Sequence, residues 1–115
     1  MPDRSSSSVR IFYPRFTREE LILALRRGLV ALREKLPLKR AVLFGSWAQG
    51  KQTVASDVDL LVVYADPSRE DAFALVKRTL NIRGLEPHVY SEAEYEGLKG
   101  TLERMAAGGV PLELE

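Results

Sequence analysis

Two aspartates separated by one residue, Asp57 and Asp59, carry the strongest chemical signal in the sequence. The valine-rich apolar run over 58–64 predicts a buried strand that begins beside them. Because side chains alternate along a strand, both carboxylates should point to the same face, several ångströms apart. Nothing basic lies between them, so burying the pair without a cation would cost several kcal/mol. A divalent metal removes this cost, and oxygen ligands favour Mg²⁺ or Mn²⁺ over zinc.

An Asp-x-Asp sequence also has a simpler interpretation, in which Asp57 caps a turn and Asp59 faces solvent. The segment upstream favours the metal site. The apolar run over 41–44 predicts a strand that ends in Gly45-Ser46, where glycine permits close backbone approach and a hydroxyl can donate to an anionic oxygen. Backbone amides of a short helical turn after Gly45 would point at the same place. These residues predict a triphosphate on one side of the site and metal on the other.

The order of these residues matches a known pattern. Leu43-Phe-Gly-Ser46, then Gly50, then Ser56-Asp-Val-Asp-Leu-Leu-Val62 closely resembles the signature of the polymerase-beta-like nucleotidyltransferase superfamily, in its minimal, stand-alone form. The resemblance, over about residues 40–92, implies that Gly45 and Ser46 contact the β- and γ-phosphates of ATP. It implies that Asp57 and Asp59 hold two Mg²⁺ ions, with Mn²⁺ as an alternative. This assignment of phosphate binding to one motif and metal binding to the other agrees with phosphoryl-type transfer, which depends on positioning and on charge neutralisation by paired metals.

A third carboxylate on a later strand completes the metal site of this family and helps to activate the nucleophile. Glu86 is the candidate here, although a glutamate departs from the more common aspartate. His88 shares the strand face of Glu86, and it is either a half-buried packing residue or a second candidate to complete the site. In the loop, Lys51 and Ser56 are further candidates for nucleotide binding, although loops routinely expose lysine.

A long amphipathic helix should precede the site. Thr17-Arg-Glu-Glu20 has capping-box spacing, and leucines then recur every three or four residues, which predicts a helix over about 18–35. Trp47, just after the glycine motif, either stacks on a base or packs in the core or against a partner. The basic residues of the helix are interpreted as a solvated outer face rather than a phosphate site: Arg26, Arg27, Arg33 and Lys35.

A second helix and a further strand should follow the site. Asp66-Pro-Ser68 predicts the start of the helix. A strand is predicted over 85–90, and Pro87 places it at a sheet edge because proline has no amide proton. Three residues of the helix are predicted to share one apolar stripe: Phe73, Val76 and Leu80.

The remaining segment completes an alternation of strands and helices. Ser91 has the spacing of a capping box, Gly100 is predicted to divide a short helix from a second one, and 110–114 could add a final strand. The pattern predicts one α/β (α+β) domain over 9–115, with a small mixed sheet flanked by helices, after a disordered tail at 1–8.

Composition narrows the function. Hydrophobic residues at 45% and charged residues at 29% of 115 are typical of one globular domain. Seventeen basic against sixteen acidic residues give a net charge of +1, which argues against strong direct binding to nucleic acid or anionic membrane. The chain has no cysteine, no signal peptide and no apolar run long enough to span a membrane, so a cytoplasmic location is expected.

The chain ends soon after its third predicted strand, so its acceptor should be recognised by a partner. Stand-alone minimal domains of this family are often paired with an all-helical HEPN protein, a ribonuclease toxin, and act as its antitoxin by transferring AMP to it. The resemblance therefore implies a toxin-antitoxin pair. The alternative is a nucleotide- or partner-binding module that neutralises its partner without catalysis. Modification of a small molecule would require a homo-oligomer to supply the acceptor pocket.

Overall fold

A mixed sheet of four strands forms the middle layer of the structure, a computed structural model that describes residues 17–112. β1 (Leu38–Phe44) pairs antiparallel with both β2 (Val58–Tyr64) and β4 (Val110–Pro111), whereas β2 and β3 (Leu85–Ser91) are parallel. The predicted tail at 1–8 lies outside the described residues, as do 113 and 114 of the predicted last strand. In their spatial order the strands are β3, β2, β1 and β4.

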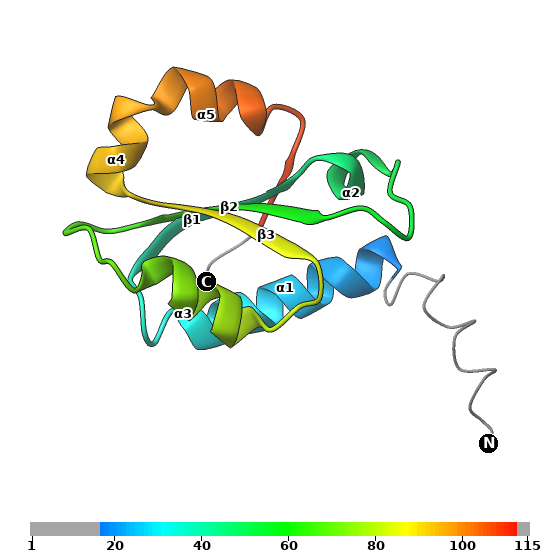
Figure 1. The fold of residues 1–115 in the computed structure, drawn as a ribbon, viewed down its shortest axis with the longest axis horizontal. Coiled ribbons are helices and arrows are strands. Elements are labelled where there is room, and N and C mark those ends of the chain that lie inside the picture. Colours follow the sequence, from blue (N-terminus) through cyan, green and yellow to red (C-terminus); the bar gives the residue numbers. More distant parts are fainter. Residues whose placement is uncertain (1–16, 113–115) are drawn as a thin grey trace.

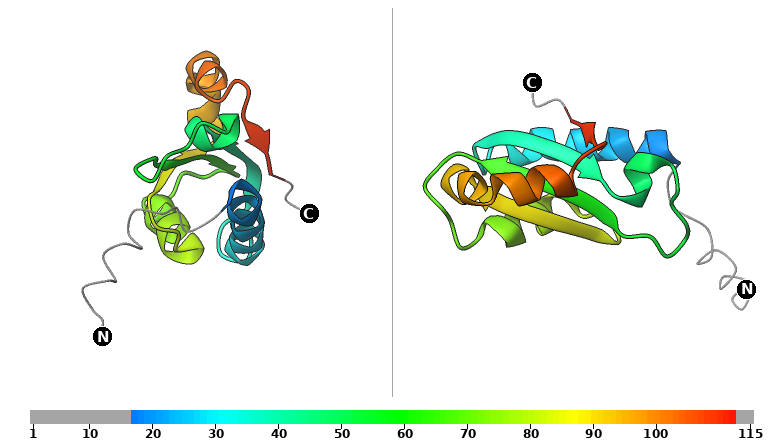
Figure 2. Two further views of the ribbon diagram at one scale, coloured as in Figure 1. Left: turned by 90° about the vertical axis from the view of Figure 1, so that its right-hand side faces the viewer. Right: turned by 90° about the horizontal axis from the view of Figure 1, so that it is seen from above.

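Helices cover both faces of this sheet (Figures 1 and 2). α1 (Arg18–Leu32) and α3 (Ala72–Leu80) lie against one face, whereas α4 (Glu92–Gly97) and α5 (Lys99–Met105) lie against the other. The four-residue α2 (Ser46–Gln49) stands at one end of the sheet, directly after β1. The predicted fold class, a small mixed sheet flanked by helices, is confirmed.

α1 forms where the capping box predicts it. The Thr17 side chain accepts from the Glu20 amide at 3.1 Å, and Glu20 accepts from the Thr17 amide at 2.9 Å. The helix ends at Leu32 instead of near residue 35, because the amides of Glu34 and Lys35 bond to carbonyls only three residues back and so form turns. The four basic residues predicted to form an outer face are exposed: Arg26, Arg27, Arg33 and Lys35. The buried residues of the helix form the apolar stripe: Leu21, Leu25, Leu29 and Leu32.

The sheet is buried on both faces, and this isolates one polar position. Along β2 every residue is buried except Asp59. The face under α1 and α3 packs Leu60 and Val62, while the face under α4 and α5 packs Leu61 and Val63. Since side chains alternate, Asp59 belongs to the face of Leu61 and Val63.

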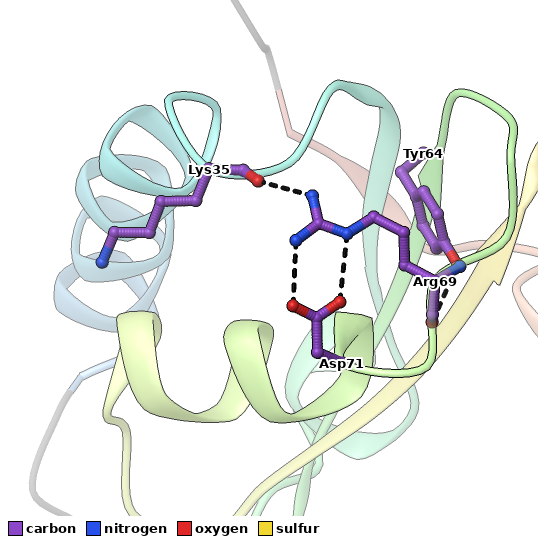
Figure 3. Close-up of polar contacts among 4 residues, drawn as sticks. All are labelled: Lys35, Tyr64, Arg69 and Asp71. Carbon is purple, nitrogen blue, oxygen red and sulfur yellow. Dashed lines mark hydrogen bonds and ion pairs between the residues drawn. The ribbon is translucent and has the colours of Figure 1, made fainter.

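The second helix begins later than predicted. α3 starts at Ala72, because residues 65–71 form a loop that is bonded to its surroundings (Figure 3). The buried Tyr64 hydroxyl accepts from the Arg69 amide at 2.8 Å, and the Arg69 guanidinium donates to the Lys35 carbonyl at 3.0 Å. Both carboxylate oxygens of Asp71 accept from the same guanidinium, at 2.9 and 3.0 Å.

The predicted apolar stripe of this helix was wrong at one position. Phe73 is 52% exposed, and the buried residues of α3 are Ala72, Val76 and Leu80. These three are spaced by four residues, so a side chain one position after Ala72 points away from the core.

The division of the last helical segment also differs from the prediction. It falls at Leu98, whose backbone departs from α-helical geometry (φ −117°, ψ 14°), while Gly100 lies inside α5. The capping box at Ser91 is present, because its hydroxyl accepts from the Glu94 amide at 3.2 Å.

β3 is an edge strand, as Pro87 predicts. The Gly84 carbonyl accepts from the Val58 amide, so the backbone groups of Leu85 and Pro87 face away from β2. Lys77 Nζ donates to the Leu85 carbonyl at 2.8 Å, and Pro87 offers no amide proton. This edge is therefore poorly suited to pairing with another strand.

Candidate active site

Gly45 lies directly against the carboxylate of Asp59. The two residues meet because β1 ends at Phe44, whose register partner on β2 is Asp59. Gly45 has φ +79° and ψ −156°, a conformation that is essentially restricted to glycine. A Cβ at this position would overlap Asp59 Oδ2 and lie 3.2 Å from Asp59 Cγ. Glycine is thus required here both by the backbone and by the neighbouring carboxylate.

Three carboxylates gather at this end of the sheet. Asp57 directly precedes β2, and Glu86 on β3 is the register partner of Asp59. Burial raises the pKa of Asp59 above its ordinary value; His88 opposes this shift, and repulsion from Asp57 and Glu86 adds to it. The structure therefore brings the three predicted acidic residues near one another, with Asp59 half-buried and the other two exposed.

His88 touches both the carboxylate and the core. Its Nε2 lies 3.9 Å from Asp59 Oδ1, and its ring packs against Phe44 with centroids 5.2 Å apart. The side chain is 33% exposed. His88 can thus be a packing residue and a site residue at the same time, because its ring packs on Phe44 while Nε2 faces Asp59.

The aspartate pair fits a metal that shares its coordination with substrate. Within residues 17–112, no group of three or more His, Cys, Asp or Glu side chains is arranged to hold a metal ion. Mg²⁺ usually binds one or two carboxylates and takes its other ligands from phosphates and water. The mutual repulsion around Asp59 is the feature that a cation would relieve. The chemistry of Asp57 and Asp59 therefore fits a cation such as Mg²⁺ that takes its other ligands from outside the protein, rather than a cage made of protein alone.

The remaining predicted nucleotide-binding residues lie on α2 and in the loop after it. Ser46 is the first residue of α2, next to Gly45. Lys51 follows α2 and is exposed. The Ser56 hydroxyl accepts from the Thr53 amide at 2.8 Å, so in this structure it closes the turn that leads into Asp57. Ser46 thus lies beside the site, the Lys51 amide donates to the Ser46 carbonyl at 2.9 Å, and Ser56 has a structural partner of its own.

Trp47 packs in the core. Only 5% of its surface is exposed, and it belongs to the cluster formed by α1, α3 and the sheet. This resolves the choice that the sequence left open between base stacking and packing.

One residue near the site was missed by sequence reasoning. Arg18, the first residue of α1, donates from Nε to the Trp47 carbonyl and from Nη2 to the Ala48 carbonyl, at 3.0 Å each. The sequence holds only a weak signal for it, since a cation is unfavourable in the first turn of its own helix.

A separate pocket of about 330 Å³ lies at the opposite end of the sheet. Its lining includes positively and negatively charged side chains, and Lys39 Nζ lies 3.8 Å from Glu92 Oε2. None of the candidate site residues takes part, so this pocket is not the site: its lining is Lys39, Arg40, Val63, Glu92, Tyr95 and Glu96.

Comparison with known proteins decides the family. A family model described as "Nucleotidyltransferase domain" matches residues 25–107. The chain belongs to the nucleotidyltransferase domain family.

Two curated relatives come from Methanocaldococcus jannaschii, and each is named "putative protein adenylyltransferase". One is 34% identical over 73 residues, which cover 61% of this chain and 73% of the relative. The other is 39% identical over 51 residues, 44% of this chain, and the match spans about half (52%) of the relative's length.

The crystal structure of a "putative nucleotidyltransferase" from Sulfolobus solfataricus has the same fold. It aligns with a TM-score of 0.59 at 20% identity, over 96% of this chain and 89% of the other. Across residues 17–112 of this nucleotidyltransferase domain, every helix lacks the length or the apolar character needed to span a membrane.

The raised pKa of Asp59 predicts that the domain is more stable without this charge. Because the folded state disfavours the ionised carboxylate, stability is lost as pH rises from the ordinary aspartate pKa through the raised one. We expect Asp59→Asn, without metal, to stabilise the fold at pH 7 by about 0.5–1 kcal/mol. This is a rise of about 3 °C in Tm, measured by thermal denaturation. The difference from the wild type should disappear below about pH 4.

Asp71 provides the control of opposite sign. The hydrogen bond from Arg69 lowers the pKa of Asp71, so Asp71→Asn should lower the Tm at pH 7. A lower Tm for Asp59→Asn at pH 7 would contradict the expected electrostatic strain at the site.

Proposed function

We propose that this domain is a metal-dependent nucleotidyltransferase that moves AMP from ATP to a hydroxyl group of a protein, and that the acceptor is a HEPN-type toxin. The observation that carries the transferase assignment is the contact between Gly45 and Asp59. A backbone with no side chain lies against a carboxylate that is itself crowded by Asp57 and Glu86. A residue without a side chain lets the backbone approach this carboxylate without displacing it, so the end of β1 can bind phosphate oxygens beside a metal-binding pair.

Each residue has a defined part in the proposed reaction. The acceptor oxygen bonds to the α-phosphorus, the bond from that phosphorus to the bridging oxygen of the β-phosphate breaks, and pyrophosphate leaves. Gly45 and Ser46 bind the β- and γ-phosphates and orient the leaving group. Asp57 and Asp59 hold Mg²⁺, which when bound neutralises the charge of the triphosphate. Glu86 lies on β3, beside Asp59 of β2, and one of its carboxylate oxygens accepts the proton of the acceptor hydroxyl.

The proposed acceptor rests on two supports. Both curated relatives carry the name "putative protein adenylyltransferase", which favours a protein acceptor. The resemblance to minimal stand-alone domains favours a HEPN toxin as that protein, with this chain as its antitoxin.

A second candidate function is neutralisation of the partner by binding alone. It is favoured by the exposure of Glu86 and by the lack of a three-ligand metal group among residues 17–112. In that case the carboxylates would not be needed for neutralisation.

Transfer of radiolabel from α-³²P-ATP, with Mg²⁺, tests the proposal. The acceptor tested is the protein encoded next to this chain in the genome, purified after co-expression, which the proposal expects to be of the HEPN type. We expect label on that protein with the wild type and with Glu70→Gln, an exposed carboxylate in the loop after β2. The double variant Asp57→Ala, Asp59→Ala should give no label and should no longer neutralise the toxin.

Two results would overturn this function. Intact binding without label from the wild type would make the chain a non-catalytic partner. Neutralisation by a folded double variant, its fold verified by circular dichroism, would show that transfer is not needed.

A further inference from the structure

The anchoring of α2 by Arg18 couples the start of α1 to the candidate site. α2 has only four residues, too few to be stable alone, so its position depends on contacts with the rest of the domain. Two such contacts are visible. The Trp47 ring is buried in the core, and the Arg18 guanidinium donates to the carbonyls of Trp47 and Ala48 at 3.0 Å each.

The positive charge of Arg18 is unfavourable for its own helix, α1, and favourable for the carbonyls of α2. Arg18 occupies the first position of α1, where the helix dipole disfavours a cation, while Glu19 and Glu20 supply the favourable charge. The carbonyls at the end of a helix have few partners within the helix and carry partial negative charge. Here the Trp47 carbonyl also accepts from the Gly50 amide, at 3.4 Å. The guanidinium spans two of them with two separate N–H groups, which a lysine ammonium on a longer, flexible stem cannot do in the same geometry.

The residues that Arg18 holds also set the position of Gly45. The amides of Ala48 and Gln49 both donate to the Gly45 carbonyl, at 3.1 and 3.2 Å. Gly45 has no spare room on the other side, because a Cβ there would overlap Asp59 Oδ2. A shift of α2 would therefore change the distance between the Gly45 backbone and the Asp59 carboxylate.

We propose that Arg18 is a positioning residue for nucleotide binding, which fixes α2 and through it the gap between Gly45 and Asp59. The inference rests on the proposed function, in which Gly45 and Ser46 bind the phosphates and Asp59 holds their metal. Arg18 itself acts only through the carbonyls of Trp47 and Ala48 and touches no substrate. Its loss should weaken nucleotide binding and leave the chemical step almost unchanged.

Arg69 provides a matched control. Its guanidinium also donates to a backbone carbonyl, that of Lys35, and bonds Asp71 (Figure 3). Lys35 follows the C-terminal end of α1, whereas Arg18 lies at the start of this helix. Arg69→Ala should thus remove a comparable contact and lower stability without affecting nucleotide binding. Comparison of Arg18→Ala with Arg69→Ala separates positioning from a general loss of stability.

The experiment measures KM and kcat for ATP, together with the Kd of a fluorescent ATP analogue, for the wild type, Arg18→Ala, Arg18→Lys and Arg69→Ala. For Arg18→Ala we expect KM and Kd to rise about tenfold, since a hydrogen bond to a charged group is of that strength. The kcat should stay within about twofold, and Arg18→Lys should recover part of the loss. Amide hydrogen exchange of Ala48 and Gln49 should accelerate in Arg18→Ala and not in Arg69→Ala.

The outcomes separate this inference from the proposed function. If the wild type is active and Arg18→Ala keeps its KM and Kd, the inference is wrong and the function stands. An equal rise of Kd in Arg69→Ala would also overturn the inference, because it would reflect stability alone. If the wild type neither binds the analogue nor transfers AMP, the proposed function falls and this inference falls with it.

Discussion

Replacement of Gly45 with alanine is expected to reduce nucleotide transfer by at least about 100-fold, because a displacement near 1 Å at reacting groups has an effect of this size. The new methyl group would occupy the space of Asp59 Oδ2 and force the carboxylate away from the gap. The positive φ of +79° adds backbone strain, so the fold should also lose about 1–3 kcal/mol. Transfer assays and chemical denaturation measure the two effects.

Gly108→Ala separates strain from collision. Gly108 also has a positive φ, +78°, but a Cβ there meets nothing within 4 Å. This variant should lose stability through backbone strain and keep wild-type transfer. If Gly45→Ala retains more than about a tenth of the wild-type rate at saturating nucleotide, the gap against Asp59 is not part of the site.

Neutralising the aspartates is the second change with a large expected effect. Asp57→Asn and Asp59→Asn should each lower transfer by at least about 10³-fold, since paired metals supply most of the charge stabilisation in this chemistry. Both variants should also lose Mg²⁺-dependent binding of ATP. Glu86→Gln should keep that binding and lose about 10²-fold in rate, as expected when only a proton acceptor is removed. Calorimetry with Mg²⁺ and ATP, beside single-turnover transfer, distinguishes these results.

The matched variant is Glu70→Gln, which removes an exposed carboxylate from the loop after β2 and should behave as the wild type. Should Asp59→Asn bind Mg²⁺ with ATP as tightly as the wild type does, the metal would have to lie elsewhere. Loss of binding in Glu86→Gln would instead make Glu86 a metal ligand, as the family resemblance implies.

Local patterns in the sequence were sufficient for the strands and for the direction of the carboxylates. The alternation of β2 places Asp59 on the face of Leu61, and Pro87 restricts β3 to an edge of the sheet. Both features depend on residues close together in the chain, so the rules of strand geometry reach them. The family also follows from such a pattern, since the glycine and aspartate motifs lie within a dozen residues of each other.

The start of α3 shows where local patterns fail. Asp66-Pro67-Ser68 has the composition of a helix start, yet the helix begins at Ala72. The loop is held by contacts with distant segments, such as the bond from Arg69 to the carbonyl of Lys35, 34 residues away. A bond of this kind is set by how α1 packs on the sheet, which propensity cannot predict.

The sequence by itself determined the family, the fold class and the identity of the acidic residues, because these follow from short-range order and alternation. Only the tertiary structure decided that Gly45 lies against Asp59, that His88 contacts both Asp59 and Phe44, and that Arg18 holds α2 from 29 residues away. The roles of the site residues stay predictions until the variants are measured. The physical reason for the division is that a side chain's own preference is local, whereas its partner is chosen by the packing of elements that are distant in the chain.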